Sequence, residues 1–356
     1  MRKEDDRWSV WSDRLFAWVA PTPFSKLPVA AGIVLLSYFV LAFVLMTWAN
    51  TTTPLVIGQL HIDLKSAATT FFRYSVIGMV VVPGIFLLEI ASVGWRDSSL
   101  HSLLIEKNIS GRSDLICFLL THLRLMRFLQ IVFTLGFALI TGDMVRAAVA
   151  NYVDLRPIIE SMPSYIEYPL GFLLYTFFDY VAHRVDHSRY FWPLHRFHHA
   201  AEEFHVMTAD RGHPGSTLTQ ASLKIFPLVA IGIPLDAIIN IGMLIVSINY
   251  LNHSRIDWDF GWFGRYVVQS PRHHQLHHRR GLRHAVNLSI CPIWDRLGGT
   301  WQDVVPAKTV LGTSVPYRHG AFIVPDLMRD YRDFLGGLSS GAQRLMTWVS
   351  TLRPRH

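Results

Sequence analysis

HRVDH at residues 183–187, HRFHH at residues 195–199 and HHQLHH at residues 273–278 are the most distinctive stretches of this sequence. Residues three and four apart lie on one face of an α-helix, so each cluster can direct two or three imidazoles towards one point. A single pair of histidines at this spacing is usually a surface feature. Here 13 of the 18 histidines fall between His183 and His284, so the clusters predict helices that present metal ligands.

The number of clustered histidines indicates how many metal ions they hold. Neutral imidazole suits iron, zinc and copper, and one metal ion rarely takes more than four protein ligands. The clusters therefore predict two metal ions, held by His183, His187, His195, His198, His199, His274, His277 and His278.

The composition of the whole chain is typical of a membrane protein. Of the 356 residues, 51% are hydrophobic and only 17% are charged, and the mean hydropathy is positive. Low charge combined with long apolar runs predicts an integral membrane protein of the all-α class. The net charge of +7 fits basic loops beside an anionic leaflet better than binding to nucleic acid.

Four apolar runs are candidate membrane spans: residues 28–48, 75–94, 128–142 and 165–182. The basic segment before the first run predicts a cytoplasmic amino terminus. Two pairs of spans then return the chain to the cytoplasmic side, where the last run leads directly into His183. Glu89 lies near the end of the second run, where we expect it to reach the membrane interface.

A fifth apolar stretch, residues 222–250, is interrupted by Pro227 and Pro234. It could be a kinked span with a partner or a re-entrant hairpin, because the histidines on both sides of it should lie on the same side of the membrane. We favour the hairpin.

Capping residues predict two short helices within the clusters. Pro193 suits the first turn of a helix that carries His195, His198 and His199. Ser270 and Pro271 suit the N-cap and first position of a second helix, and Gly281 suits its end. The two cysteines, Cys117 and Cys291, form no zinc or disulfide pattern and fit a reducing compartment.

The ordered motifs resemble a known family. HRVDH, HRFHH and HHQLHH resemble the three histidine boxes of the fatty acid hydroxylase and sterol desaturase superfamily. TADRGHP at residues 208–214, NHS at 252–254 and WDRLGGTW at 294–301 also resemble segments of that family. The resemblance extends over residues 165–301.

The resemblance implies an integral membrane di-metal oxygenase, with about four spans and a possible re-entrant hairpin under a cytosolic histidine-rich cap. Two iron ions are implied, and zinc could replace them in isolated protein. The implied ligands are His183, His187, His195, His198, His199, His253, His274, His277 and His278. No catalytic residue beyond these ligands is implied. Some relatives have another histidine where this chain has Asn249, which leaves one coordination position to water or substrate.

These features divide the chain into four parts. We expect a cytoplasmic amino-terminal segment (1–27), an amino-terminal transmembrane region (28–160), a histidine-box catalytic domain with membrane segments (161–305) and a cytoplasmic carboxy-terminal tail (306–356).

Several polar residues near the clusters have competing interpretations. Asp179 and Asp295 could accept a hydrogen bond from an imidazole and fix its tautomer, or could be ordinary caps or ion-pair partners. We expect His273 to lie on the surface and Arg211 to form a buried structural ion pair. Satisfied structural roles are the more common outcome for three further histidines, His205, His213 and His284.

The expected function is hydroxylation or desaturation of an unactivated C–H bond in a lipid such as a sterol or fatty acyl lipid. The reaction would consume O2 and electrons from a separate donor, a cytochrome b5-like protein or a ferredoxin with its reductase. The chain has no GxGxxG dinucleotide motif and no cysteine set for an iron–sulfur cluster. A zinc-dependent membrane hydrolase and a metal transporter or storage protein are the alternatives. A bacterial inner membrane and an endoplasmic reticulum membrane would both fit, with the site facing the cytoplasm.

Overall fold

The computed structural model describes most of the chain and leaves out both ends. The described residues are 27–49, 55–57, 60–62, 68–69, 72–73, 75–106, 109–134, 158–159, 161–282, 284–304, 309–319 and 323–351. Helices dominate them, which confirms the predicted all-α class. The basic amino-terminal segment and most of the expected span at 128–142 lie outside the described residues.

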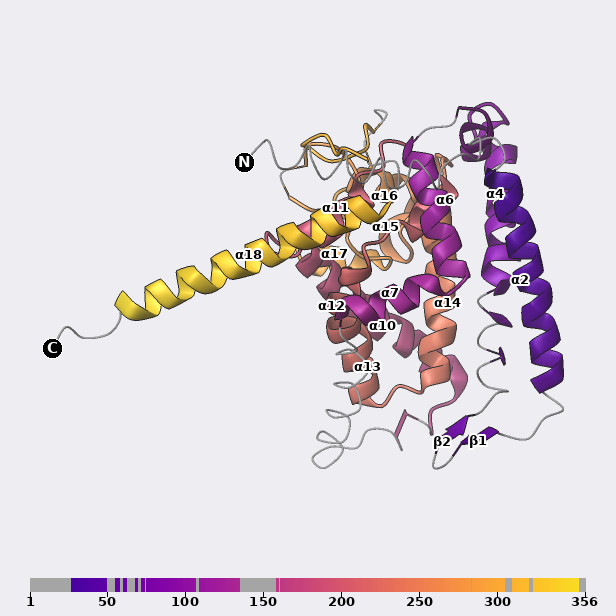
Figure 1. Ribbon diagram of the computed structural model, residues 1–356, viewed down its shortest axis with the longest axis horizontal. Helices are drawn as coiled ribbons and strands as arrows, with labels where there is room; N and C mark the ends of the chain where they lie inside the picture. The colour runs from indigo at the N-terminus through magenta and orange to yellow at the C-terminus, as the bar shows by residue number, and fades with distance from the viewer. Residues whose placement is uncertain are drawn as a thin grey trace.

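The amino-terminal part is helical, with one short antiparallel hairpin in which Leu55 pairs with Ile62. Its elements are α2 (Leu27–Ala49), β1 (Leu55–Ile57), β2 (Leu60–Ile62), the π-helical turn η2 (Ile77–Val81), α4 (Val82–Val93), α5 (Ser99–His101), the π-helical turn η3 (Ser102–Glu106), α6 (Ile109–His122) and α7 (Leu125–Thr134). α2 lies at one edge of the molecule, where it contacts η2 and α6 (Figure 1).

The carboxy-terminal part contains the histidine clusters. Its elements are α10 (Ser164–Asp186), α11 (Trp192–His199), the 3-10 turns η4 (Val206–Asp210) and η5 (Pro214–Ser216), α12 (Thr217–Thr219), the π-helical turn η6 (Gln220–Ile225), α13 (Phe226–Ile231), α14 (Leu235–Asn252), α15 (Gly261–Tyr266), α16 (Pro271–His277), α17 (Pro292–Leu297) and α18 (Ile323–Thr351). α11 and α16 lie towards one end of the helical body, and α18, in the expected tail, extends away from it (Figure 1).

The fifth apolar stretch folds back on itself. Pro227 lies in the first turn of α13, directly after η6, so the helical path continues through this proline. The reversal comes later, where Gly232 has a φ of 97° and Pro234 caps the start of α14. Glycine takes this left-handed conformation without the clash that a Cβ would cause. The stretch is therefore a helical hairpin, although only one of its two prolines marks the turn.

The helices of this hairpin share a core with α10. Tyr175 of α10 packs in one cluster with Leu228 of α13, Ile241 and Ile245 of α14, and Ile290. None of the helices in the described ranges combines the length and the apolar character needed to cross a bilayer. The number of spans and the four-part division of the chain remain predictions.

The sequence suggested that Glu89 reaches a membrane interface, whereas the structure places it inside the protein, because the chain folds back over the end of α4. The side chain is fully buried. Its carboxylate accepts hydrogen bonds from the backbone N–H of Ser99 at 2.8 Å, from the Ser99 hydroxyl at 2.6 Å and from the backbone N–H of Arg255. Glu89 therefore joins α4 to the loop after α14.

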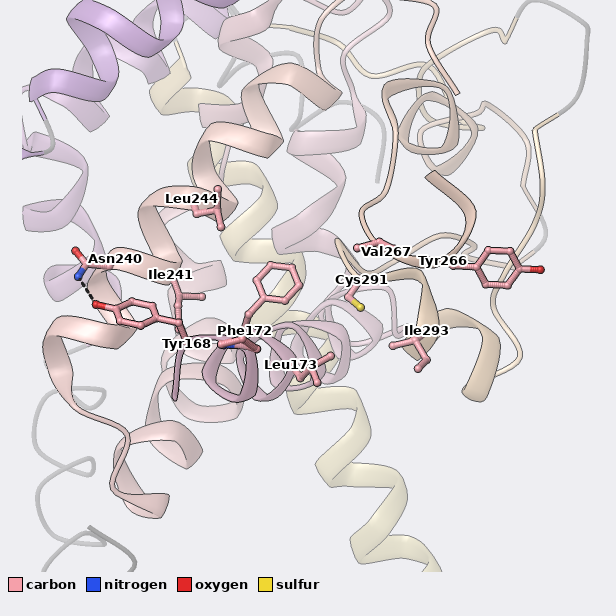
Figure 2. Close-up of a pocket in the computed structure, with 11 residues that line it drawn as sticks. Tyr168, Phe172, Leu173, Asn240, Ile241, Leu244, Tyr266, Val267, Cys291 and Ile293 are labelled. Carbon is pink, nitrogen blue, oxygen red and sulfur yellow. Dashed lines mark hydrogen bonds between the residues drawn. The ribbon is translucent and has the colours of Figure 1, made fainter. Parts of the chain in front are cut away.

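An open pocket of about 530 Å³ lies between α10 and α14 and is bordered by residues in and next to α15 and α17 (Figure 2). Its walls are almost entirely apolar and include Phe172, Ile241 and Leu244. The Asn240 Nδ2 group donates a hydrogen bond to the Tyr168 hydroxyl at 3.0 Å, which places one polar pair in the pocket wall.

Candidate metal centre

α10 delivers the first two histidines at its carboxy-terminal end. His183 lies in the last turn and His187 is the C-cap. Their rings lie one helical turn apart, with centroids separated by 5.1 Å, so both imidazoles occupy the same side of the helix end.

The two short helices predicted from capping residues are present. Pro193 lies in the first turn of α11. Ser270 caps α16, and its hydroxyl accepts a hydrogen bond from the backbone N–H of His273. α16 ends earlier than predicted, at His277, and Gly281 instead forms a separate turn with a φ of 80°.

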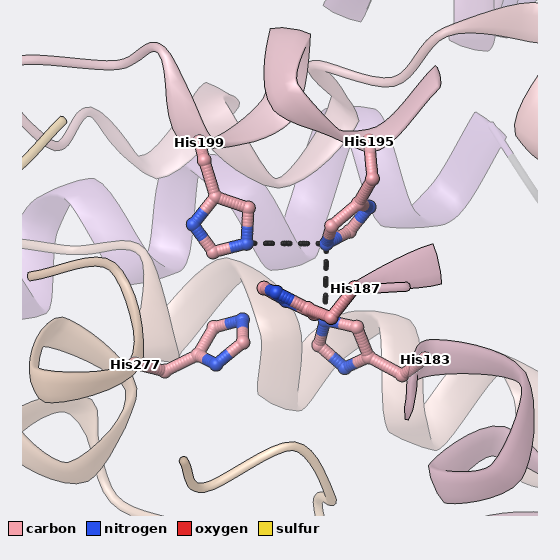
Figure 3. A group of neighbouring side chains, drawn as sticks. All are labelled: His183, His187, His195, His199 and His277. Atoms are coloured by element: carbon pink, nitrogen blue, oxygen red, sulfur yellow. Dashed lines mark hydrogen bonds between the residues drawn. The ribbon is translucent and has the colours of Figure 1, made fainter. Parts of the chain in front are cut away.

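Five imidazoles converge in a first histidine group (Figure 3). It contains His183, His187, His195, His199 and His277, and one ring nitrogen from each lies within 4.8 Å of the others. The Nε2 atom of His195 lies 3.1 Å from the Nε2 atoms of both His183 and His199. α10, α11 and α16 thus meet at one point.

Four further imidazoles form a second histidine group, with the same 4.8 Å limit on the distances between their ring nitrogens. It contains His198, His253, His274 and His278. The Nε2 atoms of His253 and His274 lie 3.0 Å apart. The two groups adjoin, because the rings of His199 and His278 stack with centroids 4.1 Å apart. All nine histidines singled out in the sequence therefore lie in these two groups.

Hydrogen bonds fix the tautomers of five of these rings. In each, Nδ1 lies close to a carbonyl oxygen: His183 to Leu288 at 2.7 Å, His198 to Arg211 at 3.0 Å, His253 to Asn249 at 2.8 Å, His277 to Val286 at 2.7 Å, and His274 to the Gln269 side chain at 3.0 Å. A carbonyl oxygen only accepts, so Nδ1 carries the proton and Nε2 keeps its lone pair.

This arrangement fits metal ions. The Nε2 atoms of His253 and His274 both carry lone pairs, yet they face each other at 3.0 Å with no proton to share. Two nitrogens bound at about 2.1 Å and at right angles to one metal ion would lie about 3.0 Å apart. In addition, Nε2 of His187, Nε2 of His277 and both ring nitrogens of His278 are buried without a hydrogen-bond partner among the described residues. Such orphaned atoms are costly unless a ligand satisfies them.

Burial also keeps the imidazoles neutral. Desolvation lowers the pKa of all nine rings, that of His253 to about 4. Neutral imidazole is the form that binds a metal ion. The second group has four imidazoles where the first has five, and Asn249, one turn before His253, contributes its backbone carbonyl to His253.

We expect the metal-free protein to lose stability as the pH falls below 6.5. The unfolded chain protonates its histidines near pH 6.5, whereas the folded chain keeps His253 neutral down to about pH 4. The unfolded state therefore binds more protons in this window, and the free energy of unfolding decreases with decreasing pH. Asp186 and Asp210, whose pKa values burial raises to about 7, act in the opposite direction. Burial also raises the pKa of Asp295 and that of Asp330, but the nine imidazoles outnumber these four carboxyls.

Thermal unfolding of chelator-treated protein at pH 7.5 and pH 5 measures this effect. An equal or higher midpoint at pH 5 would contradict it.

Neither aspartate proposed as an imidazole acceptor contacts an imidazole. Asp179 instead forms an ion pair with Lys224 of η6 at 3.0 Å. Asp295 accepts hydrogen bonds from the backbone N–H groups of Leu288 and Ser289 at 2.7 and 2.9 Å. Asp295 therefore fixes the loop whose Leu288 carbonyl accepts a hydrogen bond from His183. It orients that ligand indirectly, through the loop.

His273 is buried rather than exposed, which corrects the expectation from the sequence. Its Nδ1 lies 2.7 Å from the Ser270 hydroxyl, and its ring packs against Trp301. α16 is covered on both faces, so the side opposite the metal ligands is also packed. His274, not His273, joins the second histidine group, in agreement with the register chosen from the sequence.

Replacing His273 with alanine should therefore reduce stability while sparing metal binding. Loss of its buried hydrogen bonds is expected to cost about 1–3 kcal/mol. Denaturant unfolding and metal analysis of the same preparation check both parts. Loss of one metal ion per chain would show that His273 belongs to the site.

His205, His213 and Arg211 have structural partners. His205 Nδ1 lies 3.0 Å from Asp114, and His213 Nε2 lies 2.8 Å from the Leu327 carbonyl oxygen. The buried Arg211 forms an ion pair with Asp114 at 2.9 Å, as expected from the sequence. His284 is exposed.

Three residues at the site were not anticipated from the sequence. Phe204 lies with its ring centroid 4.9 Å from those of His253 and His278, and covers the second group. Trp192 packs against His187 and His199 of the first group. Gln269 orients His274, and its place just before the Ser270 cap is a signal that could have indicated it.

Comparison with known proteins identifies this region of the chain. Residues 168–300 match the family model described as fatty acid hydroxylase. All nine clustered histidines lie inside the match, whereas α2 to α7 and α18 lie outside it. No solved structure matches the chain.

Proposed function

Since residues 168–300 belong to the fatty acid hydroxylase and sterol desaturase superfamily, we propose that the protein is a membrane-bound di-iron oxygenase. It would hydroxylate or desaturate an unactivated C–H bond of a lipid, with O2 and external electrons.

The observation that carries this proposal is the pair of adjoining histidine groups. Among the described residues, both consist of imidazoles alone, five in one and four in the other. Imidazole suits iron, and a four-imidazole site leaves coordination positions for other ligands. Bound iron would supply the O2 activation and C–H oxidation that no amino-acid side chain provides.

Other residues of the protein hold the nine imidazoles in place and shield them from water. Backbone carbonyls of Leu288, Val286 and Asn249 fix ring orientation in both groups. His277 and His278 are at most 2% exposed, and Phe204 covers the second group. A water-excluded site of this kind limits side reactions.

We assign the pocket between α10 and α14 to the lipid tail (Figure 2). Leu173, Leu244 and Ile293 line it and are partly exposed at the molecular surface, which favours lateral entry from a bilayer. Leu173 precedes His183 by ten residues on α10, a distance of about 15 Å along the helix axis. The pocket would thus hold the part of a long molecule that lies remote from the oxidised carbon.

Replacing Leu244 with tryptophan should obstruct this pocket. We expect kcat/KM for a long-chain lipid to fall at least about 10-fold, since even one methylene in an apolar pocket changes discrimination by about 10–200-fold. Leu87→Trp on α4, at a side chain that is 68% exposed, is the matched control. Unchanged kinetics in Leu244→Trp would place the substrate elsewhere.

Exposed apolar side chains support a membrane location. Ile33, Val40 and Phe43 of α2 are each at least 50% exposed, and their spacing of seven and three residues places them on one face of the helix. Such surfaces are typical of contact with lipid. Resistance of the protein to alkaline carbonate extraction would support integration, and protease protection of epitope-tagged loops would test whether the site faces the cytoplasm.

Electrons would come from a separate donor protein, a cytochrome b5-like protein or a ferredoxin with its reductase. The two cysteines cannot form the four-cysteine set of an iron–sulfur cluster, and no dinucleotide motif is present in the sequence. Substrate oxidation by purified protein with NADPH alone would contradict this part of the proposal.

The decisive experiment is metal analysis of detergent-purified protein, followed by O2-dependent lipid turnover with an added electron donor. We expect two iron ions per chain and product formation only with O2, and a lower metal content in His198→Ala. Two zinc ions that resist replacement by iron, with O2-independent hydrolysis, would favour a zinc hydrolase. Metal flux in proteoliposomes without turnover would favour a transporter.

A further inference from the structure

The two histidine groups differ in where their supports come from. In the first group, the carbonyls that orient His183 and His277 belong to Leu288 and Val286. Both lie within residues 168–300, the segment that matches the family model. In the second group, the residues that support His198 and His253 are themselves hydrogen-bonded to side chains of α6. This helix lies outside the matched segment.

The first connection runs through Arg211. The Arg211 carbonyl accepts a hydrogen bond from His198 Nδ1 at 3.0 Å. Its guanidinium is fully buried and donates to Asp114 of α6 at 2.9 Å and to the Ser110 hydroxyl at 2.8 Å. The residue that orients His198 is therefore anchored to α6.

Asp114 also holds the other end of the same loop. Its Oδ2 atom accepts a hydrogen bond from the Thr208 hydroxyl at 2.7 Å and lies 3.0 Å from His205 Nδ1. Asp114 is itself 0% exposed. One buried carboxylate thus fixes the path of η4 at three points, and with it the Arg211 carbonyl.

The second connection runs through α14. Tyr250 lies one turn before His253, and its hydroxyl donates to Asp210 and lies 2.9 Å from His122 Nε2 at the end of α6. Leu115 and Phe118 of α6 pack in the same core cluster as Tyr250. His198 and His253, the two ligands of the second group that do not belong to α16 or its C-cap, are therefore both connected to α6 through hydrogen bonds.

We propose that α6 positions the second histidine group, with Asp114 and His122 acting as positioning residues for His198 and His253. This rests on the proposed di-metal function. It means that the family-matched segment needs the amino-terminal region to complete the second group.

Cobalt titration of the metal-free protein, followed by visible absorption, tests this proposal. In wild type we expect two Co²⁺ ions per chain. Asp114→Asn should weaken one site by about 10- to 100-fold, the usual cost of removing an outer support of a metal ligand, and leave the other site unchanged. The absorption spectrum of the weakened site should also change, because its imidazoles lose their fixed orientation.

Double variants identify which site is affected. In a His198→Ala background, where the second group has already lost a ligand, Asp114→Asn should cause no further weakening of the remaining site. In a His187→Ala background, the full 10- to 100-fold loss should persist. Asp179→Asn is the matched control, because Asp179 pairs with Lys224 in a partly buried ion pair and makes no hydrogen bond to an imidazole, and both affinities should stay as in wild type.

Equal weakening of both sites, or no weakening of either, in Asp114→Asn would overturn the proposal. If that variant does not fold, as judged by circular dichroism, Tyr250→Phe removes the hydroxyl between His122 and Asp210 with little change in shape. It should weaken the same single site, and unchanged affinities would overturn the proposal. A wild-type protein that binds neither Co²⁺ nor Fe²⁺ would refute the di-metal function itself, whereas two bound Co²⁺ ions with no effect of these variants would refute only the role of α6.

Discussion

Replacing His277 with alanine is expected to abolish lipid oxidation. The His277 ring lies with its centroid 4.7–4.9 Å from those of His183, His187 and His199, at the centre of the first histidine group. Removal of an outer support of a ligand already costs about 10–100-fold in metal affinity or activity, so loss of the ligand should cost more than about 100-fold. Turnover and metal content, measured on one preparation, check this result.

The control for His277→Ala is the neighbouring His273→Ala, which removes an imidazole from the same helix but outside either group. We expect His277→Ala to retain the helical circular dichroism of wild type, because the helical body does not depend on this side chain. Activity above a tenth of wild type in His277→Ala would exclude this histidine as a ligand.

Replacing Arg211 with alanine is expected to give the largest loss of stability. Arg211 and Asp114 are both 0% exposed, so the substitution leaves a buried carboxylate without its cation. Removal of one partner from a buried ion pair typically costs about 3–5 kcal/mol. Denaturant unfolding would measure the loss, and the double variant Arg211→Met with Asp114→Leu should recover part of it, since it removes both charges.

A loss below 1 kcal/mol in Arg211→Ala would mean that water or His319 compensates Asp114. His319 is the natural candidate, because its ring lies 3.2 Å from the Arg211 guanidinium.

The histidine groups were predictable because helical spacing is local. His198 and His199 follow His195 by three and four residues. Pro193, which starts α11, lies in the same short stretch of sequence and predicted the beginning of the helix. His253 is different: it stands alone in the sequence and was singled out only through the family resemblance. The structure places it at the C-cap of α14, beside His274.

The supports of the ligands could not be predicted, for two physical reasons. Backbone carbonyls such as that of Leu288 have no sequence signature, because every residue carries one. Asp114 and Arg211 are far apart in the chain, and only tertiary folding brings α6 against η4. The burial of His273 could not be predicted because Trp301, which packs against its ring, is distant in the sequence.

Most of the acceptors that fix the imidazole tautomers are main-chain oxygens, which a side-chain substitution does not remove. Four of the five acceptors, at Leu288, Val286, Asn249 and Arg211, are backbone carbonyls. A substitution that preserves the backbone path changes the side chain but keeps the acceptor. Substitutions at Leu288 and Val286 that fit the surrounding packing should therefore leave the tautomers of the ligands unchanged. Sequence change at these positions thus need not alter the metal centre.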